Sequence, residues 1–222
     1  MGDGVEKLSC HLEADLDRSG ASVLDIRPLL WRDGWPVAGE NFRAGTYEIE
    51  SARTGTALEL AVEGAPVGGG RGGRGGGAPR GAAPASIPAQ DAAQVSANWP
   101  AGAVDVQMSP YLLQAQQKWT VTPAPNAGGY PGSPYFKITI AGTDRALAAT
   151  EGGDVIALPS FTGGPEQLWR IDQLADGSYR VMPKVIPNTR APMALSAVGS
   201  SMPTLAGFKP DSDRQRWLFK TP

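Results

Sequence analysis

Gln117-Lys118-Trp119, a short segment near the middle of the chain, occurs twice more further on. The later copies are Gln167-Leu168-Trp169 and Gln215-Arg216-Trp217, and the tryptophans lie 50 and 48 residues apart. A sequence period of that size is typical of repeat architectures. We therefore predict three copies of one structural unit.

Each copy ends a longer matching segment. An aromatic-led stretch that favours a strand comes first, and a small residue followed by leucine comes next. The strands are Tyr47-Glu48-Ile49, Tyr135-Phe136-Lys137-Ile138 and Tyr179-Arg180-Val181, and the pairs are Ala57-Leu58, Ala146-Leu147 and Ala194-Leu195. The leucine and the tryptophan are 22 residues apart in the second and third units but 61 apart in the first. The first unit therefore carries an insert of roughly 39 residues.

The motif has a physical reason to recur. A β-unit of about 40 residues cannot bury its own apolar face, whereas three units packed around an axis share a core and cover strand edges. Tryptophan supplies a large apolar area and one donor that needs a partner. A glutamine two residues earlier points to the same side of a strand, where its amide can bond backbone groups at a turn. We interpret these residues as structural: Gln117, Trp119, Gln167, Trp169, Gln215 and Trp217.

With these three ordered motifs over residues 43–222, the chain resembles the ricin-B-type β-trefoil lectins and the related family 13 carbohydrate-binding modules. The resemblance implies an all-β protein with a β-trefoil fold, in which each unit can hold a shallow sugar site. In that family an Asp after a Cys-Leu or Ala-Leu pair binds sugar hydroxyls; the position falls here on Glu59, Ala148 and Ser196. The stacking aromatic of the family falls on Gln107, Ala157 and Leu205. By this pattern the sites are degenerate or relocated.

A substitute is an aromatic residue eight or nine positions before each tryptophan: Tyr111, Phe161 and Phe208. Polar or turn-forming residues flank these rings, and an exposed ring with a few polar neighbours suits a sugar, whose C–H face is apolar. Alternatively, the three rings plug the open end of the trefoil as core. The candidate sugar-binding residues are Glu59, Gln107, Tyr111, Gln114, Phe161, Phe208 and Asp211. The first unit, with Glu59, Gln107, Tyr111 and Gln114, is the best single site.

Residues 1–42 do not match the repeat. Ser22–Arg27 alternates apolar and polar residues, which favours a strand. This part resembles the C-terminal end of the catalytic domain of glycoside hydrolase family 43, the arabinanase and xylosidase β-propellers. The resemblance rests on Leu24-Asp25-Ile26-Arg27-Pro28-Leu29-Leu30-Trp31 and Asp33-Gly34-Trp35-Pro36. It implies that residues 1–42 are a remnant of the last propeller strands with a linker, and that a parent catalytic domain lies in cis.

Family 43 enzymes cleave glycosidic bonds with a pair of carboxyl groups, and no acidic residue of this chain maps to that pair. We therefore expect no catalysis by this chain. The resemblance implies that the module holds its parent hydrolase near a plant-type polysaccharide: arabinan, arabinoxylan or xylan. One alternative is a structural accessory domain without sugar affinity. Another is a fragment of an arabinan-degrading hydrolase. His11 matches a histidine that can help hold a central ion in that family, and a role for it here stays open.

Composition agrees with a turn-rich, all-β module. The chain has 29 Gly and 20 Pro, with charged residues at 19%. A single Cys allows no internal disulfide, and one Cys with one His excludes a structural zinc site. A net charge of −2 argues against a nucleic acid or an anionic membrane as partner. We expect a monomer without metal or cofactor. By analogy with the parent enzyme it would be extracellular or periplasmic. Met1–Gly4 does not begin a signal peptide, so the signal of a secreted parent would belong to a missing N-terminus.

The insert of the first unit spans about residues 64–102. Residues 64–90 are rich in Gly, Arg, Pro and Ala, a composition that cannot offset the entropy of ordering, so we predict a flexible loop. The alternative is an Arg-Gly-Gly tract that binds RNA, which three arginines without interleaved aromatics support weakly. Asp211-Ser212-Asp213 resembles part of a calcium loop, but two carboxylates alone favour a solvated turn.

Overall fold

The computed structural model describes residues 11–15, 21–25, 27–62, 95–130, 133–186, 188–199 and 201–222. Its N-terminal part consists of two antiparallel hairpins. The first pairs β1 (His11–Asp15) with β2 (Ala21–Asp25), and the second pairs β3 (Leu29–Arg32) with β4 (Trp35–Ala38). These hairpins are the short N-terminal β-segment that the sequence led us to expect.

Each of the three units contributes four strands. Unit one contains β5 (Gly45–Ser51), β6 (Ala57–Leu60), β7 (Val104–Ser109) and β8 (Trp119–Pro123); unit two contains β11 (Phe136–Ile140), β12 (Ala146–Ala149), β13 (Val155–Leu158) and β14 (Trp169–Gln173); unit three contains β15 (Tyr179–Pro183), β16 (Met193–Ser196), β17 (Thr204–Gly207) and β18 (Trp217–Lys220). A 3-10 turn precedes the last strand of each unit: η3 (Ala115–Gln117), η4 (Pro165–Gln167) and η5 (Asp213–Gln215). The remaining elements are η2 (Ser96–Asn98), β9 (Gly129–Tyr130) and β10 (Ser133–Pro134).

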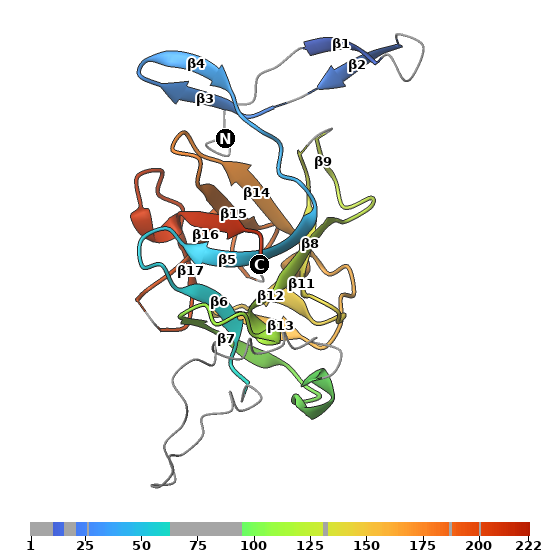
Figure 1. Ribbon diagram of the computed structural model, residues 1–222, viewed down its shortest axis with the longest axis vertical. Coiled ribbons are helices and arrows are strands. Elements are labelled where there is room, and N and C mark those ends of the chain that lie inside the picture. The colour runs from blue at the N-terminus through green and yellow to red at the C-terminus, as the bar shows by residue number, and fades with distance from the viewer. Residues whose placement is uncertain are drawn as a thin grey trace, which may run out of the picture.

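The first and last strands of the units form a closed antiparallel ring of six strands. β5 pairs with β8, β8 with β11, β11 with β14, β14 with β15, β15 with β18, and β18 with β5. The middle strands form the hairpins β6–β7, β12–β13 and β16–β17 (Figure 1). Closure removes the open edges that an unpaired strand would leave. A six-stranded ring with three hairpins is a β-trefoil, which confirms the fold class predicted from the repeats.

Equivalent residues of the three units supply the core. The central aliphatic residue of the first strand, the leucine of the second strand and the motif tryptophan are all buried. They are Ile49, Ile138, Val181, Leu58, Leu147, Leu195, Trp119, Trp169 and Trp217. In β7 alternate side chains point to opposite faces, so Val104, Val106 and Met108 are buried while Gln107 and Ser109 remain partly accessible.

One end of the ring is filled by aromatic side chains around Phe42. Its ring centre lies 5.4 Å from those of Tyr47 and Phe136, 5.3 Å from that of Tyr179 and 4.6 Å from that of Phe219. Tyr47, Phe136 and Tyr179 occupy equivalent positions at the start of the first strands. The segment before β5 therefore supplies the side chain that closes this end, and tilted or edge-on ring pairs stabilise it beyond their buried area.

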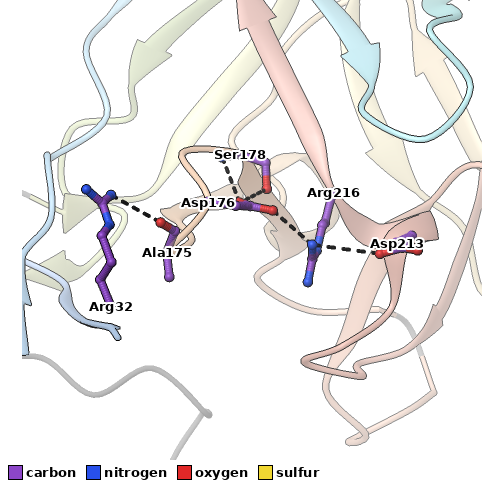
Figure 2. A network of polar contacts seen from close by, with 6 residues as sticks. All are labelled: Arg32, Ala175, Asp176, Ser178, Asp213 and Arg216. Carbon is purple, nitrogen blue, oxygen red and sulfur yellow. Dashed lines mark hydrogen bonds and ion pairs between the residues drawn. The ribbon is translucent and has the colours of Figure 1, made fainter. Parts of the chain in front are cut away.

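The β3–β4 hairpin is bonded to the turn between β14 and β15. Arg32 Nη2 donates to the carbonyl oxygen of Ala175 at 3.2 Å (Figure 2), and the Glu40 amide donates to Gln173 Oε1 at 2.6 Å. In Figure 1 this hairpin lies at the upper end of the molecule, while β6 and β7 lie towards the lower end. The segment before residue 43 is thus joined to the trefoil by hydrogen bonds of Arg32 and Glu40.

Most of the predicted insert, residues 64–94, lies outside the described residues. Residues 95–102 are described, and Trp99 there is buried. Arg145 holds this segment, since its Nη2 donates to the Pro100 carbonyl at 2.6 Å and its Nη1 to the Gly102 carbonyl at 2.7 Å. Burial lowers the pKa of Arg145, but the guanidinium group stays protonated. The segment that leads into β7 therefore packs against unit two.

Candidate functional site

Each motif tryptophan bonds the last strand of its unit to the second strand. The indole Nε1 donates to a leucine carbonyl at 2.8 Å in unit one and at 2.9 Å in units two and three. The pairs are Trp119 with Leu58, Trp169 with Leu147 and Trp217 with Leu195. All three indoles are fully buried, and the hydrogen bond satisfies the single polar group of each. These tryptophans hold the fold and are out of reach of a ligand.

Each motif glutamine forms hydrogen bonds with the backbone on both sides of the aromatic residue that the sequence analysis proposed for sugar stacking. Gln117 Nε2 donates to the Pro110 carbonyl at 2.8 Å, and its Oε1 accepts from the Leu112 amide at 2.7 Å, with Tyr111 between them. The same pair of hydrogen bonds recurs around Phe161 and Phe208. Gln167 bonds Ser160 O and Thr162 N, and Gln215 bonds Gly207 O and Lys209 N. Each glutamine therefore positions one aromatic ring.

Phe161 and Phe208 are half-buried beneath a cation of their own unit. Lys137 Nζ lies 5.4 Å from the centre of the Phe161 ring, and Arg180 Cζ lies 4.2 Å from that of Phe208. One face of each ring is thus occupied, which leaves less ring surface for a sugar than an open platform would offer. The aromatic cluster around Phe42, and not these two rings, closes the end of the barrel.

Unit one differs, because an acidic residue takes the position of Lys137 and Arg180. Glu48 is that residue, and burial followed by the Glu48 charge raises the pKa of Tyr111. The Tyr111 ring is half-buried, and its hydroxyl oxygen is buried without a hydrogen-bond partner among the described residues.

Glu59 lies at the centre of a polar cluster on the β6–β7 hairpin. Its Oε2 accepts from Gln117 Nε2 at 2.8 Å and from the Ser109 hydroxyl, and its Oε1 accepts from Gln107 Nε2 at 3.4 Å. Glu59 is 8% exposed, so only a small part of it is accessible. We call Glu59, Gln107, Ser109 and Gln117 the unit-one cluster. The structure therefore brings together three residues that the sequence analysis named, and adds Ser109.

The equivalent positions in the other units hold no such cluster. Ala148 and Ser196 replace Glu59, and their pairing partners Ile156 and Thr204 replace Gln107, the pairing partner of Glu59. Ala148 and Ser196 are buried, and Ile156 and Thr204 are partly exposed. The placement of Ala157 and Leu205 at the Gln107 position was wrong, because they pair with Leu147 and Leu195 as Met108 pairs with Leu58. Units two and three therefore hold no carboxylate and no amide at these positions.

The loop after the cluster exposes two adjacent leucines. Leu112 is 61% exposed and Leu113 is 57% exposed. Leu113 also has a left-handed backbone with φ of 60°, whereas Gly163 (φ 81°) occupies the same position relative to the motif glutamine in unit two. A left-handed backbone costs little for glycine and of order 1–3 kcal/mol for other residues. Unit one thus has an exposed leucine, with a strained backbone, at the position where unit two has a glycine that adopts the same backbone without strain.

Gln114 closes this loop. It is half-buried, its amide donates to Gln117 Oε1 at 3.4 Å, and its side-chain oxygen accepts from Gln116. Because one glutamine, Gln117, bonds the backbone or side chains of Glu59, Ser109, Pro110, Leu112 and Gln114, all of these groups lie within reach of one side chain. Four candidate residues of unit one thus gather around one surface loop.

Asp211, the remaining candidate, is exposed on the turn before η5. Its neighbour Asp213 lies 3.7 Å from Arg216 Nη1, and the same nitrogen lies 2.9 Å from Asp176 (Figure 2). Burial would raise the pKa of Asp176, but hydrogen bonds from Ser178 and the charge of Arg216 outweigh it and hold this pKa below its ordinary value. These contacts fasten η5 to the β14–β15 turn. None of these contacts involves Asp211.

Sequence reasoning missed Ser109, Leu112, Leu113 and Glu48. A signal for Leu113 was present, because aligning the units on the motif glutamine sets it against Gly163, and a leucine in a glycine position of a turn is unusual. Ser109 carried no signal. It reaches Glu59 only because β6 and β7 pair, and serine is common in any strand edge or turn.

The carboxyl of Glu48 makes stability depend on pH. Burial, with the hydrogen bond and charge of Glu50, raises the pKa of Glu48 from 4.5 to about 7, against the charge of Lys220. The folded protein therefore holds this proton more tightly than the unfolded chain. Its contribution to stability is complete below pH 4.5 and is lost as the pH rises through about 7, an effect of about 3 kcal/mol.

Urea unfolding between pH 4.5 and 8.5 would measure this loss. We expect the free energy of unfolding to fall over that range in the native protein and to change much less in Glu48→Gln. Glu151→Gln, at an exposed position, is the matched control and should follow the native curve. Parallel curves for the native protein and Glu48→Gln would contradict this assignment.

Two negative findings concern the described part of the chain alone. No group of three or more His, Cys, Asp or Glu side chains there is placed to hold a metal ion. No helix there is both long and apolar enough to cross a membrane.

Residues 115–201 match the family model described as a ricin-type beta-trefoil lectin domain-like family. That segment covers the end of unit one, all of unit two and the start of unit three. No curated protein sequence matches the chain. The matched part is similar to a ricin-type lectin-like domain, a class whose general property is carbohydrate binding and which is typically non-catalytic.

Solved structures share the fold at low sequence identity. A mosquitocidal holotoxin superposes with a TM-score of 0.53 at 14% identity, over 81% of this chain and 17% of the toxin. An apo crystal form of the BEL β-trefoil gives 0.51 at 11% identity, over 82% and 96%. A Polyporus squamosus lectin, solved with Neu5Acα2-6Galβ1-4GlcNAc, gives 0.50 at 17% identity, over 80% and 49%. The chain thus spans about a sixth of the toxin and about half of that lectin.

Proposed function

We propose that the chain is a non-catalytic carbohydrate-binding module and that unit one binds the sugar. The observation that carries the proposal is the combination found in unit one alone: an ordered carboxylate cluster next to an exposed leucine in a strained backbone. Strain of this kind is kept where the surrounding structure and the function require it. The family-model match supports a sugar as the ligand.

The chemistry of the two parts of the site is complementary to a sugar ring. A pyranose or furanose has an apolar C–H face and an edge of hydroxyl groups, so it needs apolar surface beside polar acceptors and donors. Leu112 and Leu113 offer the apolar surface, and the half-buried Tyr111 directly precedes them in the loop. The unit-one cluster offers the polar groups.

Glu59 retains capacity for a ligand although it is already bonded. A carboxylate has about four lone-pair positions, and three are used by Gln107, Ser109 and Gln117. One acceptor position remains, and the three protein donors fix the orientation of the carboxylate in advance. Such preorganisation lowers the cost of binding a sugar hydroxyl.

The wider role we propose is targeting. The chain would hold a family 43-type glycoside hydrolase, present as a catalytic domain in cis, near arabinan, arabinoxylan or xylan. Support comes from the sequence of residues 24–36 and from the contacts of the β3–β4 hairpin with the trefoil, which would join the two domains firmly. Under this proposal the protein acts outside the cell or in the periplasm, as a monomer, and its catalytic carboxylates lie on the parent domain.

The test is affinity electrophoresis through gels that contain arabinan, arabinoxylan, xylan, galactan or β-glucan. We expect retardation in at least one gel. Leu113→Gly should weaken the binding about tenfold, because it removes the exposed side chain, while the relieved backbone keeps or raises stability. A purely structural role for this residue predicts the opposite: unchanged binding. Tyr111→Ala and Glu59→Gln should weaken binding in the same gel.

Val198→Ala is the matched control, since Val198 is an exposed aliphatic residue of unit three. It should leave the mobility unchanged. Native mobility in every gel, or equal weakening by Val198→Ala and Leu113→Gly, would refute the unit-one site.

A second candidate function is a structural accessory domain. The observation in its favour is that units two and three hold buried Ala148 and Ser196 at the position of Glu59. Electrophoresis separates the two candidates, because an accessory domain would pass every gel unretarded.

A further inference from the structure

A pocket of about 590 Å³ lies between β14, the end of β15 and the loop that leads to β16. Three of its lining side chains are cationic: Arg170 on β14, Lys184 just after β15, and Arg190 in the loop. No acidic residue is among the described residues that line it. Tyr135 and Met193 add apolar surface. The pocket shares no lining residue with the unit-one cluster.

A buried carboxylate on β14 contacts two arginines, of which only Arg170 lines the pocket. Asp172 Oδ2 lies 2.7 Å from Arg170 Nε and 3.1 Å from Arg180 Nη2. Asp172 and Arg180 are buried, and the Arg170 side chain is 13% exposed. Two guanidinium groups thus share one carboxylate oxygen. Asp172 therefore fixes the guanidinium group of Arg170 at the pocket, and the other two cations of the lining are Lys184 and Arg190.

Lys184 and Arg190 add two further positive charges to the pocket lining. Lys184 Nζ donates to the Ala127 carbonyl at 2.6 Å and lies 5.0 Å from the centre of the Tyr135 ring. These contacts hold the ammonium group at the pocket and leave it further N–H donors. Arg190 is exposed, and no carboxylate of the described residues pairs with it.

We propose that this pocket binds the anionic group of an acidic saccharide, a carboxylate or a sulfate carried on a sugar ring. Guanidinium groups bind both anions through paired hydrogen bonds. The volume is in the range of pockets that enclose small ligands, and Tyr135 and Met193 can contact the ring of the sugar. The inference rests on the proposed function only in taking a saccharide as the ligand, because the site and its chemistry are separate from unit one.

Isothermal titration calorimetry with polygalacturonate and with dextran sulfate tests the inference and separates the two anions. We expect at least one of them to bind at low salt, and the double variant Lys184→Gln with Arg190→Gln to bind it about tenfold more weakly. Arg214→Gln is the matched control, because Arg214 is an exposed arginine of η5 outside the pocket. It should change the affinity less than about twofold. Thermal unfolding of each variant confirms that it is folded.

Equal affinities of the native protein and the double variant for both polymers would overturn the inference. An equal loss in Arg214→Gln would overturn it as well, since the attraction would then be unspecific. Tighter binding of a single-stranded oligonucleotide, lost in the double variant, would replace the saccharide by a nucleic acid. Failure of this site is distinguishable from failure of unit one: Leu113→Gly should weaken binding of the neutral polysaccharide and leave the acidic one unchanged.

Discussion

Replacing Trp169 with alanine is expected to lower the free energy of unfolding by about 3–5 kcal/mol. The side chain is fully buried in the shared core, so its removal leaves a large cavity. It also removes the Nε1 donor that bonds the Leu147 carbonyl at 2.9 Å, which leaves a buried acceptor without a partner. Since unit two pairs with strands of both other units, the loss should affect the whole trefoil.

Urea unfolding followed by circular dichroism measures this effect. Trp35→Ala is the matched control, because Trp35 in the β3–β4 hairpin is 74% exposed. Its replacement should change the free energy of unfolding by no more than about 0.5 kcal/mol. A loss below about 1 kcal/mol for Trp169→Ala would mean that the motif tryptophan does not hold the core.

Asp172→Asn is expected to cost about 3–5 kcal/mol, the other large effect. The carboxylate is 1% exposed and pairs with both Arg170 and Arg180. Asparagine keeps the shape but removes the negative charge that faces two guanidinium groups, one of which is almost fully buried. Removing one partner of a buried ion pair is far more costly than removing an exposed pair.

Asp213→Asn serves as control for the charge change. Asp213 lies 3.7 Å from Arg216, but its side chain is 70% exposed. The expected change is within about 0.5 kcal/mol. If the two substitutions had equal effects on urea unfolding, the cluster of Arg170, Asp172 and Arg180 would not be a stabilising unit.

The fold could be predicted because its elements repeat. Trp119, Trp169 and Trp217 follow an equivalent leucine in each unit, and such residues must occupy equivalent places in a symmetric core. Even a large insert in unit one did not hide the period. The three aromatic-led segments that were predicted as strands coincide with β5, β11 and β15, apart from Tyr135, which directly precedes β11.

The candidate site was predictable only in part. Glu59 was placed by its position after Ala57-Leu58, but its partners Ser109 and Gln117 lie 50 and 58 residues further along the chain. Ser109 and Gln117 reach Glu59 only after β6 pairs with β7 and η3 forms. No local sequence pattern predicts such a long-range contact. The left-handed backbone of Leu113 is likewise a product of the loop and not of the residue.

The cationic pocket could not be predicted from the sequence for a similar reason. Lys184 contacts the carbonyl of Ala127, 57 residues away, and the ring of Tyr135. Charged residues are common in loops, and nothing in the order of the residues indicates that Arg170, Lys184 and Arg190 converge. Convergence of this kind is a property of the closed barrel.

The pairing of β5 with β18 also bears on how the protein is made. Lys220 bonds Glu50 at 2.7 Å across a separation of 170 residues, and these two strands close the ring. Contacts so distant in sequence form late, because a long loop must close before they stabilise anything. During synthesis β5 must therefore wait, with one edge unpaired, until residues 217–220 have left the ribosome. Over that interval the nascent chain depends on its hairpins, and on any chaperone that covers β5, to stay free of wrong partners.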